Sequence, residues 1–193
     1  MCESLSCVWY VGYGSCLCEE RFLCYICGGK FKWGGREAKG CKDKTLPVAN
    51  KPFRLPHSLY FAKTSGGWGY GGVAFIPPEI EPNESKWIFG RMWKIKHAQF
   101  LEVWKQEGKC GLWYGKKIPL GKDEEGIPIY TITNTAILEL NKPSKGYLRT
   151  MALGLKETYN LTDEEIAEYF VYKCRTKGNF ARDELMEIIA LAT

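Results

Sequence analysis

Near its N-terminus the chain places a glycine and a serine where they could bind an anion. Residues 7–13 are apolar and rich in Val, Trp and Tyr, which predicts a buried β-strand that runs directly into Gly14 and Ser15. A glycine at this point permits a sharp turn and a close approach of the backbone to a ligand. Backbone N–H groups left free past such a strand can hold a small anion or stabilise an oxyanion. A plain β-turn is the alternative interpretation.

A carboxylate later in the chain could act as an acid or base. Residues 97–107 predict a helix with an apolar stripe, ended by Gly108. Glu107 then lies in the last turn, where the negative end of the helix dipole disfavours its ionisation. An aromatic neighbour such as Trp104 or Trp113 that excludes water would raise the pKa of Glu107 toward neutrality, where it suits general-base work. The alternative is a solvent-exposed glutamate before a helix-ending glycine.

Three segments, in this order, resemble the γ-glutamylcyclotransferase-like family. Residues 10–17 read Tyr-Val-Gly-Tyr-Gly-Ser-Cys-Leu, similar to the family's Tyr-Phe-Ala-Tyr-Gly-Ser-Asn-Leu, with Cys16 in place of Asn. Residues 90–95 and the helix that closes on Glu107 resemble the family's strand and helix that carry its catalytic glutamate. Residues 143–147 are similar to the segment from which the family supplies a substrate-contacting tyrosine. Together these segments span most of the chain.

This resemblance implies an enzyme that cyclises a γ-glutamyl amide or peptide to 5-oxoproline and releases an amine or amino acid. The implied partner is a small γ-glutamyl substrate, with no metal and no organic cofactor. Glu107 carries over as the catalytic acid and base. The residues implied to hold the substrate are Tyr10, Val11, Gly12, Tyr13, Gly14, Ser15, Tyr114 and Tyr147. A homodimer is implied only by analogy with relatives.

The order of predicted elements is that of an α+β protein. We expect a single domain over residues 1–193, with a core at 7–157 and a helical C-terminal tail at 158–193. The resemblance implies a small mixed β-barrel-like sheet with peripheral helices. Predicted strands are 7–13, 31–33, 58–62, 73–76, 86–95, 112–118 and 127–133; predicted helices are 18–27, 97–107, 147–156, one opened by a capping box at 162–165, and 181–191. Residues 30–56 predict a long surface loop, and the glycine run at 65–72 a flexible hairpin or a loop over a pocket.

The charge pattern argues against nucleic-acid binding. The net charge is +5, and many of the lysines and arginines fall within residues 28–62. No recognisable nucleic-acid module accompanies them, so a solvated basic face is expected, with attraction of an acidic small molecule as the second interpretation. We read no secretion signal and no apolar stretch long enough to cross a membrane, which predicts a cytoplasmic, reduced protein.

The nine cysteines and two histidines suggest other chemistry only weakly. The spacing of Cys24 and Cys27 suits zinc, but no second matched pair is present, so we expect no metal site. His57 and His97 show no spacing that would make Ser15 or Cys16 a nucleophile.

Two alternatives stay open. One is another γ-glutamyl acyl-transfer enzyme on the same scaffold, for example one that uses Cys16. The other is a non-catalytic module that binds a ligand or a protein.

Overall fold

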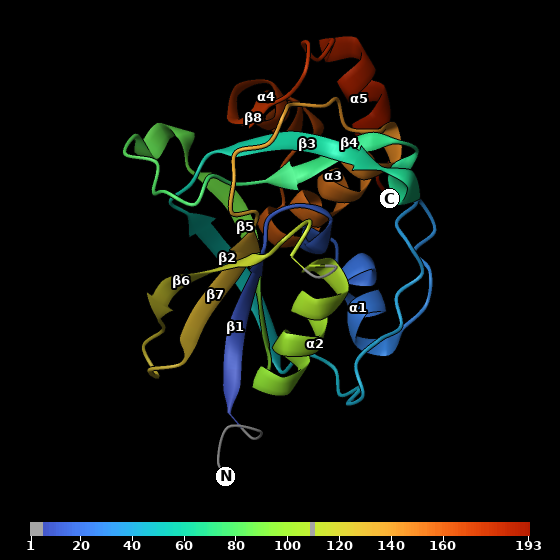
Figure 1. Ribbon diagram of the computed structural model, residues 1–193. Coiled ribbons are helices and arrows are strands. Elements are labelled where there is room, and N and C mark those ends of the chain that lie inside the picture. Colours follow the sequence, from blue (N-terminus) through green and yellow to red (C-terminus); the bar gives the residue numbers. More distant parts are fainter. Residues whose placement is uncertain (1–5, 109–110) are drawn as a thin grey trace.

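The longest strands form one five-stranded mixed sheet. The computed structural model describes residues 6–108 and 111–193, and the strand order is β2-β5-β1-β7-β6 (Figure 1). These strands are β1 (Cys7–Gly12), β2 (Ala49–Leu55), β5 (Ile88–Lys96), β6 (Lys116–Lys122) and β7 (Pro128–Thr133). The central strand β1 is antiparallel to β5 and parallel to β7. The predicted N-terminal strand is therefore the middle of the sheet.

Side chains on β1 alternate between two parts of the core. Trp9 and Val11 pack into the larger cluster, which extends to the C-terminal helices. Val8 and Tyr10 pack into a second cluster between the sheet and the helices α1 (Glu19–Cys27) and α2 (His97–Gly108). Because successive side chains of a strand point to opposite faces, only every second residue of β1 can face the same side.

A smaller sheet contains the strands β4-β3-β8, and one of them comes from the C-terminal tail. Its strands are β3 (Leu59–Ser65), β4 (Gly71–Phe75) and β8 (Cys174–Arg175). The two residues of β8 pair in parallel with Leu59 and Tyr60. The tail is thus helical with one short strand, which ties it to the middle of the chain.

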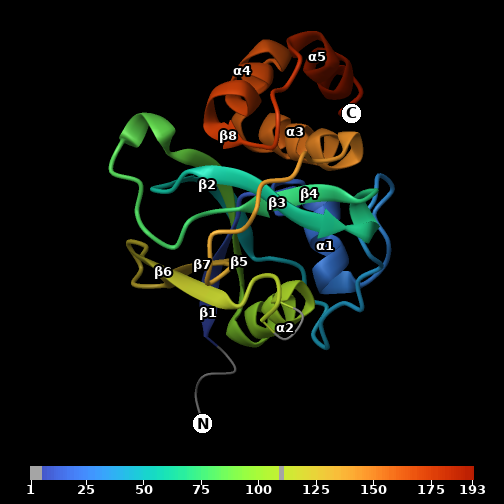
Figure 2. The ribbon, with the colours of Figure 1, turned by 45° about the horizontal axis from the view of Figure 1, so that its top comes forward.

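Helices gather at two ends of the molecule. In Figures 1 and 2, the C-terminal helices lie beside the three-stranded sheet, whereas α1 and α2 lie toward the other end. The C-terminal helices are α3 (Lys145–Tyr159), α4 (Asp163–Lys173) and α5 (Arg182–Ala190), and the short 3-10 helices are η2 (Ser15–Leu17), η3 (Gly66–Trp68) and η4 (Glu84–Lys86). The predicted capping box opens α4: the Thr162 side chain accepts from the Glu165 N–H, and the Glu165 side chain accepts from the Thr162 N–H.

The α+β class is confirmed, but the barrel-like sheet is not closed. Within the described residues, β2 and β6 are the open edges of the five-stranded sheet. The predicted strand 31–33 is wrong, and the predicted strand 112–118 is confirmed only from Lys116 onward. Residues 31–33 form a turn, and residues 112–114 form a turn before β6 begins at Lys116. Both segments are followed by glycine, which favours turns over regular pairing.

The predicted loop at 30–56 is a loop only as far as residue 48. Its end forms β2, which pairs along its length with β5 even though it contains Pro52. Proline has no N–H to donate, but an edge strand needs donors on one side only. The strand was missed because its pairing partner, β5, is distant in sequence.

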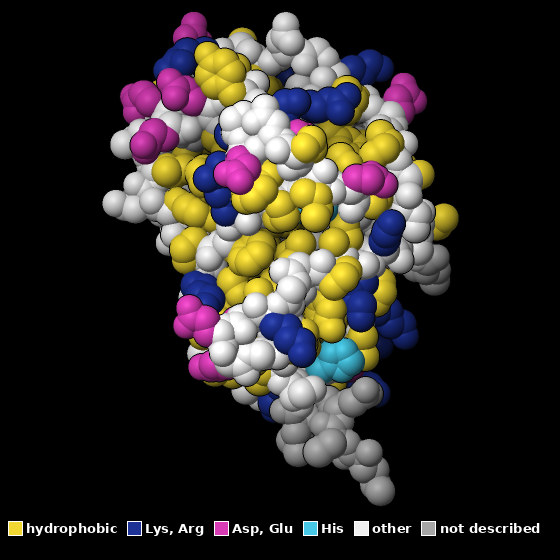
Figure 3. Space-filling model, turned by 90° about the vertical axis from the view of Figure 1, so that its left-hand side faces the viewer, with side chains coloured by type: hydrophobic (Ala, Val, Ile, Leu, Met, Phe, Trp, Pro, Cys, Tyr) yellow, Lys and Arg dark blue, Asp and Glu magenta, His cyan; other side chains and the backbone are white. Residues whose placement is uncertain are grey.

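One face of the molecule exposes apolar side chains. Figure 3 shows the side that lies at the left in Figure 1, where hydrophobic side chains gather in the middle of the face between charged ones. Large exposed apolar residues of the described chain include Ile80, Ile137 and Leu112. Exposed apolar patches can mark interaction sites, but no second chain is present, so a homodimer stays a prediction.

Candidate active site

A cavity of about 280 Å³ lies where the turn after β1 meets the end of α2. Its walls come from segments far apart in sequence: the turn at 12–16, α1, residues 36–39, η3, residues 113–114 and the first part of α3. Of the residues predicted to bind substrate or catalyse, the cavity is lined by Tyr10, Gly12, Tyr13, Gly14, Ser15, Glu107, Tyr114 and Tyr147.

Val11 is the exception among the predicted residues. Its side chain has no exposed surface and packs in the larger core cluster, and it does not line the cavity. The cause is the alternation of β1, which sends Tyr10 and Val11 to opposite faces. Only the backbone of Val11 makes a polar contact here: its carbonyl accepts a hydrogen bond from Thr131 Oγ1 at 2.7 Å.

Glu107 lies in the last turn of α2, and its carboxyl group faces the cavity. Burial raises the pKa of Glu107 above its usual range, while the nearby Arg21 guanidinium and hydrogen bonds from Cys16 and Tyr25 partly offset the rise. The Cys16 thiol donates to Glu107 Oε1 at 3.2 Å. Trp113 lines the same cavity.

The turn after β1 is shaped by two glycines that have no room for a side chain. A Cβ on Gly12 would lie 2.5 Å from the Cβ of Cys16, and a Cβ on Gly14 would lie 2.5 Å from the Tyr147 hydroxyl. The backbone continues as the short helix η2, in which Leu17 N–H donates to the Gly14 carbonyl. The glycines therefore bring the turn against Tyr147.

Tyr147 has its hydroxyl hydrogen available. Its oxygen accepts a hydrogen bond from Ala74 N–H at 3.0 Å and a longer one from Ser15 N–H at 3.4 Å. Burial raises the pKa of Tyr147, which keeps the hydroxyl protonated. Both acceptor positions of a tyrosine hydroxyl are then used, and within the described residues no acceptor is seen for its hydrogen. The hydroxyl can donate to a molecule in the cavity.

The other tyrosines of the cavity are held by the protein itself. Tyr114 donates to the Ala74 carbonyl at 2.8 Å, and its ring stacks on Phe75 with 4.7 Å between centroids. Tyr13 donates to the Ile132 carbonyl at 2.8 Å. Their hydroxyl hydrogens are already used, so these two residues shape the cavity more than they offer donors to a ligand.

Several cavity residues were not predicted from the sequence. Arg21 and Tyr25 come from α1, and Arg21 Nη2 donates to the Tyr25 hydroxyl at 2.6 Å. Gln106 joins the walls: it accepts from Gly40 N–H and donates to the Tyr25 carbonyl. The spacing of Arg21 and Tyr25 by one helical turn was the available signal, but an arginine among glutamates reads as solvent-exposed.

The basic segment also reaches the cavity. Arg36, Glu37 and Lys39 are exposed residues that line it, and Gly35 N–H donates to the Gly67 carbonyl at 2.7 Å. Trp68 of η3 lines the same wall. The glycine run therefore lies over a pocket, which was one of its two predicted roles.

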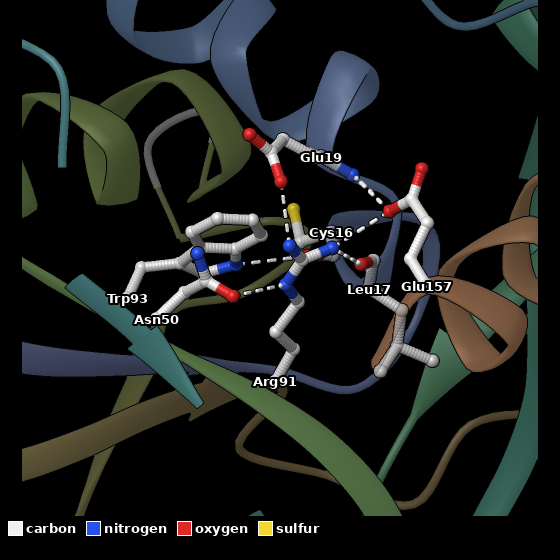
Figure 4. A network of polar contacts seen from close by, with 7 residues as sticks. All are labelled: Cys16, Leu17, Glu19, Asn50, Arg91, Trp93 and Glu157. Carbon is white, nitrogen blue, oxygen red and sulfur yellow. Dashed lines mark hydrogen bonds and ion pairs between the residues drawn. The ribbon is translucent and has the colours of Figure 1, made fainter. Parts of the chain in front are cut away.

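A buried arginine outside the cavity fixes the turn in place (Figure 4). Arg91 of β5 donates to the Leu17 carbonyl at 3.2 Å and pairs with Glu157 and Glu19, each at 2.6 Å. Its guanidinium lies 4.2 Å from the ring of Trp93, whose indole N–H donates to the Cys16 carbonyl at 3.0 Å. These contacts hold the two carbonyls that follow Ser15.

The described residues give no structural support to the other candidate chemistries. Within residues 6–108 and 111–193, no three His, Cys, Asp or Glu side chains come together as a group that could hold a metal. The seven cysteines of that part are free. His57 binds the carbonyls of Pro77 and Glu79 through Nδ1, away from the cavity. None of the helices described there is long and apolar enough to cross a bilayer.

Comparison with solved structures identifies the fold. A protein described as a γ-glutamyl cyclotransferase superposes with a TM-score of 0.59 at 22% identity, covering 96% of this chain and 99% of its own. An uncharacterized protein from Homo sapiens superposes with a TM-score of 0.60 at 23% identity, with the same coverage. The chain therefore has the γ-glutamyl cyclotransferase fold.

Comparison of the sequence with curated proteins finds a match to a protein with a different description. The chain is 30% identical over 208 residues to "Histone deacetylase 5" of Arabidopsis thaliana, a match that covers 88% of this chain and 31% of that protein. The chain thus spans about a third of the length of this curated relative. No model of a known protein family matches the sequence.

Proposed function

We propose that the chain cyclises a γ-glutamyl amide or peptide to 5-oxoproline and releases an amine or amino acid. The observation that carries this proposal is one cavity lined by a partly buried carboxylate of raised pKa, Glu107, and by the donor groups of Ser15 and Tyr147. The fold, shared with γ-glutamyl cyclotransferases, supports the same reaction class.

The proposed reaction needs one group that takes and returns a proton. Glu107 removes a proton from the substrate's α-ammonium group, and the freed nitrogen attacks the γ-carbonyl carbon of the same molecule. A C–N bond forms and the carbonyl oxygen becomes an oxyanion. The attacking nitrogen then carries two hydrogens and a positive charge. Glu107 gives its proton to the leaving nitrogen as the bond to that nitrogen breaks, and the ionised Glu107 then takes the second proton from the ring nitrogen and passes it to the released amine. Atoms balance without water, and no covalent enzyme intermediate is needed.

The remaining groups stabilise charge and hold the substrate folded. The Ser15 N–H makes only a long contact with Tyr147, so it and the Tyr147 hydroxyl are available to the oxyanion. The cavity is proposed to hold one substrate folded, with its α-nitrogen against its γ-carbonyl, which removes an entropic barrier from the ring closure. The reaction draws on no metal or organic cofactor, and we place it in the cytosol.

The alternative reaction through Cys16 is disfavoured by the site. Only 4% of this residue is exposed, and burial followed by the adjacent Glu107 raises the pKa of its thiol well above the usual value. The reactive form of a cysteine nucleophile is the thiolate, which this setting suppresses. Cys16 instead acts as a hydrogen-bond donor to Glu107.

The test is 5-oxoproline release from γ-glutamyl amino acids, γ-glutamylamines and glutathione. Glu107→Gln should lower kcat by about 10³-fold, because a positioned acid or base contributes about 10² to 10⁴. Glu102→Gln is the matched control: it lies on the same helix outside the cavity, and glutamine retains an acceptor for its contact with Lys42 N–H.

The possible outcomes separate the proposed mechanism from the alternatives. Full turnover by Glu107→Gln would contradict the mechanism. No product from any substrate, with a folded protein that still binds γ-glutamyl compounds saturably, would favour the non-catalytic module instead.

A further inference from the structure

Arg21 is a buried cation of the cavity wall with unused donors. Only 3% of the residue is exposed, and it lines the cavity. Its Nη2 donates to the Tyr25 hydroxyl, but Nε and Nη1 have no hydrogen-bond partner in the described structure. Buried donors are almost always paired, so an arginine left in this state requires an explanation.

The neighbours of Arg21 fix the position of its guanidinium. The group stacks on the Tyr25 ring at 4.2 Å, and the Trp68 ring lies 5.9 Å away on a different segment. A Cβ on Gly35 would approach Nε at 3.2 Å, and the φ of +82° also favours glycine there. The guanidinium is therefore preorganised by its neighbours, as a planar fork that binds a carboxylate must be.

Among residues 6–108 and 111–193, no carboxylate accepts a hydrogen bond from Arg21 Nε or Nη1. Glu107 is the nearby acid and influences Arg21 electrostatically, yet no ion pair joins the two among the described residues. A ligand with its own carboxylate would supply the missing acceptors.

We propose that Arg21 binds the free α-carboxylate of the γ-glutamyl group, so that the cavity selects substrates with this carboxylate unblocked. This inference rests on the proposed function and adds a specificity-determining residue to it. In the reaction described above, Glu107 must reach the α-nitrogen, and the α-carboxylate is attached to the same carbon atom. A cation near Glu107 is therefore placed to meet it.

Burial distinguishes the two carboxylates that a γ-glutamyl amino acid carries. The leaving group differs between substrates and must depart, so it belongs at the open side of the cavity, where Arg36 and Lys39 are exposed. The glutamyl group is common to all of them and belongs at the enclosed side. Arg21 has almost no exposed surface, unlike Arg36 and Lys39, so we assign it to the glutamyl group.

The experiment compares three substrates that differ in one carboxylate each: γ-glutamylalanine, the same compound with its glutamyl α-carboxylate converted to a carboxamide, and γ-glutamylethylamide. The wild type should prefer the free α-carboxylate by about 100-fold in kcat/KM, because a charge-assisted hydrogen bond to Arg21 is lost in the carboxamide. Arg21→Gln should abolish this preference, because it should slow only the two substrates with a free α-carboxylate, γ-glutamylalanine and γ-glutamylethylamide. Arg21→Lys should retain part of it through its charge.

Arg149→Gln is the matched control. Arg149 also stacks on an aromatic ring, Trp33 at 3.9 Å, and also has a buried Nε without a partner, but it does not line the cavity. Its replacement should leave the preference for the free α-carboxylate unchanged.

A second measurement does not depend on turnover. Binding of 5-oxoproline and of 5-oxoprolinamide is followed by calorimetry, and Arg21→Gln should lose the preference for the acid. The proposal is overturned if Arg21→Gln keeps the preference for the free α-carboxylate in both assays. It is also overturned if Arg21→Gln loses only the discrimination between γ-glutamylalanine and γ-glutamylethylamide, because these two compounds differ in the carboxylate of the leaving group. If the wild type releases no 5-oxoproline but Arg21→Gln still loses selective binding, the proposed function fails and the carboxylate site stands.

Discussion

Replacing Cys16 with alanine should move the acid limb of the pH–rate profile to higher pH. The thiol donates to Glu107 Oε1 at 3.2 Å, and this hydrogen bond favours the ionised carboxylate, opposing the burial that raises the pKa of Glu107. A thiol is a weak donor, so we assign the contact about 0.7 kcal/mol, the lower end for a hydrogen bond. At 1.36 kcal/mol per pKa unit, its loss raises the pKa of Glu107 by about half a unit.

The sign follows from the role proposed for Glu107. The base must be ionised in the free enzyme, so kcat/KM rises with pH through the pKa of Glu107. Removing a donor that stabilises the ionised form shifts this rise to higher pH. Cys16→Ser introduces a stronger donor and should shift it to lower pH, provided that the hydroxyl makes the same contact. The assay is kcat/KM for 5-oxoproline release, measured from about pH 4 to about pH 8.

Cys18→Ala is the control for this series. Cys18 is fully buried in the same turn but does not line the cavity, so its loss should lower stability through packing and leave the acid limb in place. If kcat/KM of Cys16→Ala and of Cys16→Ser rises at the same pH as that of the wild type, the thiol does not tune the pKa of Glu107.

Three further predictions concern stability and the cavity donors. Arg91→Ala should lower the free energy of unfolding by about 2 to 3 kcal/mol in urea titrations. This is less than for a fully buried ion pair, because Glu19 is half exposed. The control Arg54→Ala, at an exposed arginine, should lower it by under about 1 kcal/mol. Equal losses would contradict this assignment. Tyr147→Phe leaves two buried N–H groups unpaired and removes an oxyanion donor, so it should destabilise by about 1 to 3 kcal/mol and lower kcat by about 10²-fold; unchanged kcat would exclude the donor role. Burial lowers the pKa of His57, so the unfolded chain binds its proton more readily. This contribution to stability is complete above the unfolded pKa of about 6.5 and is lost as the pH falls below it, so His57→Gln should flatten that slope in unfolding curves.

Elements with local signals were predictable from the sequence. The apolar strand β1, the helix that ends after Glu107 and the capping box at Thr162 are determined by residues close together in the chain. The same locality placed Gly14 and Ser15 at a turn. Glu107 and this turn could be named as parts of one site only through the family resemblance, because 91 positions separate Cys16 from Glu107.

Features that depend on distant partners were decided by tertiary structure. β2 and the two-residue strand β8 exist because β5 and β3 offer edges to pair with, and neither segment shows a strand pattern of its own. The fate of Arg21 is of the same kind. By its residue type it belongs at the surface, and only the meeting of α1 with Gly35 and Trp68 encloses its guanidinium beside Glu107. Local sequence determines helices, turns and caps through short-range hydrogen bonds, whereas burial and the pKa of a carboxylate depend on which segments the fold brings together.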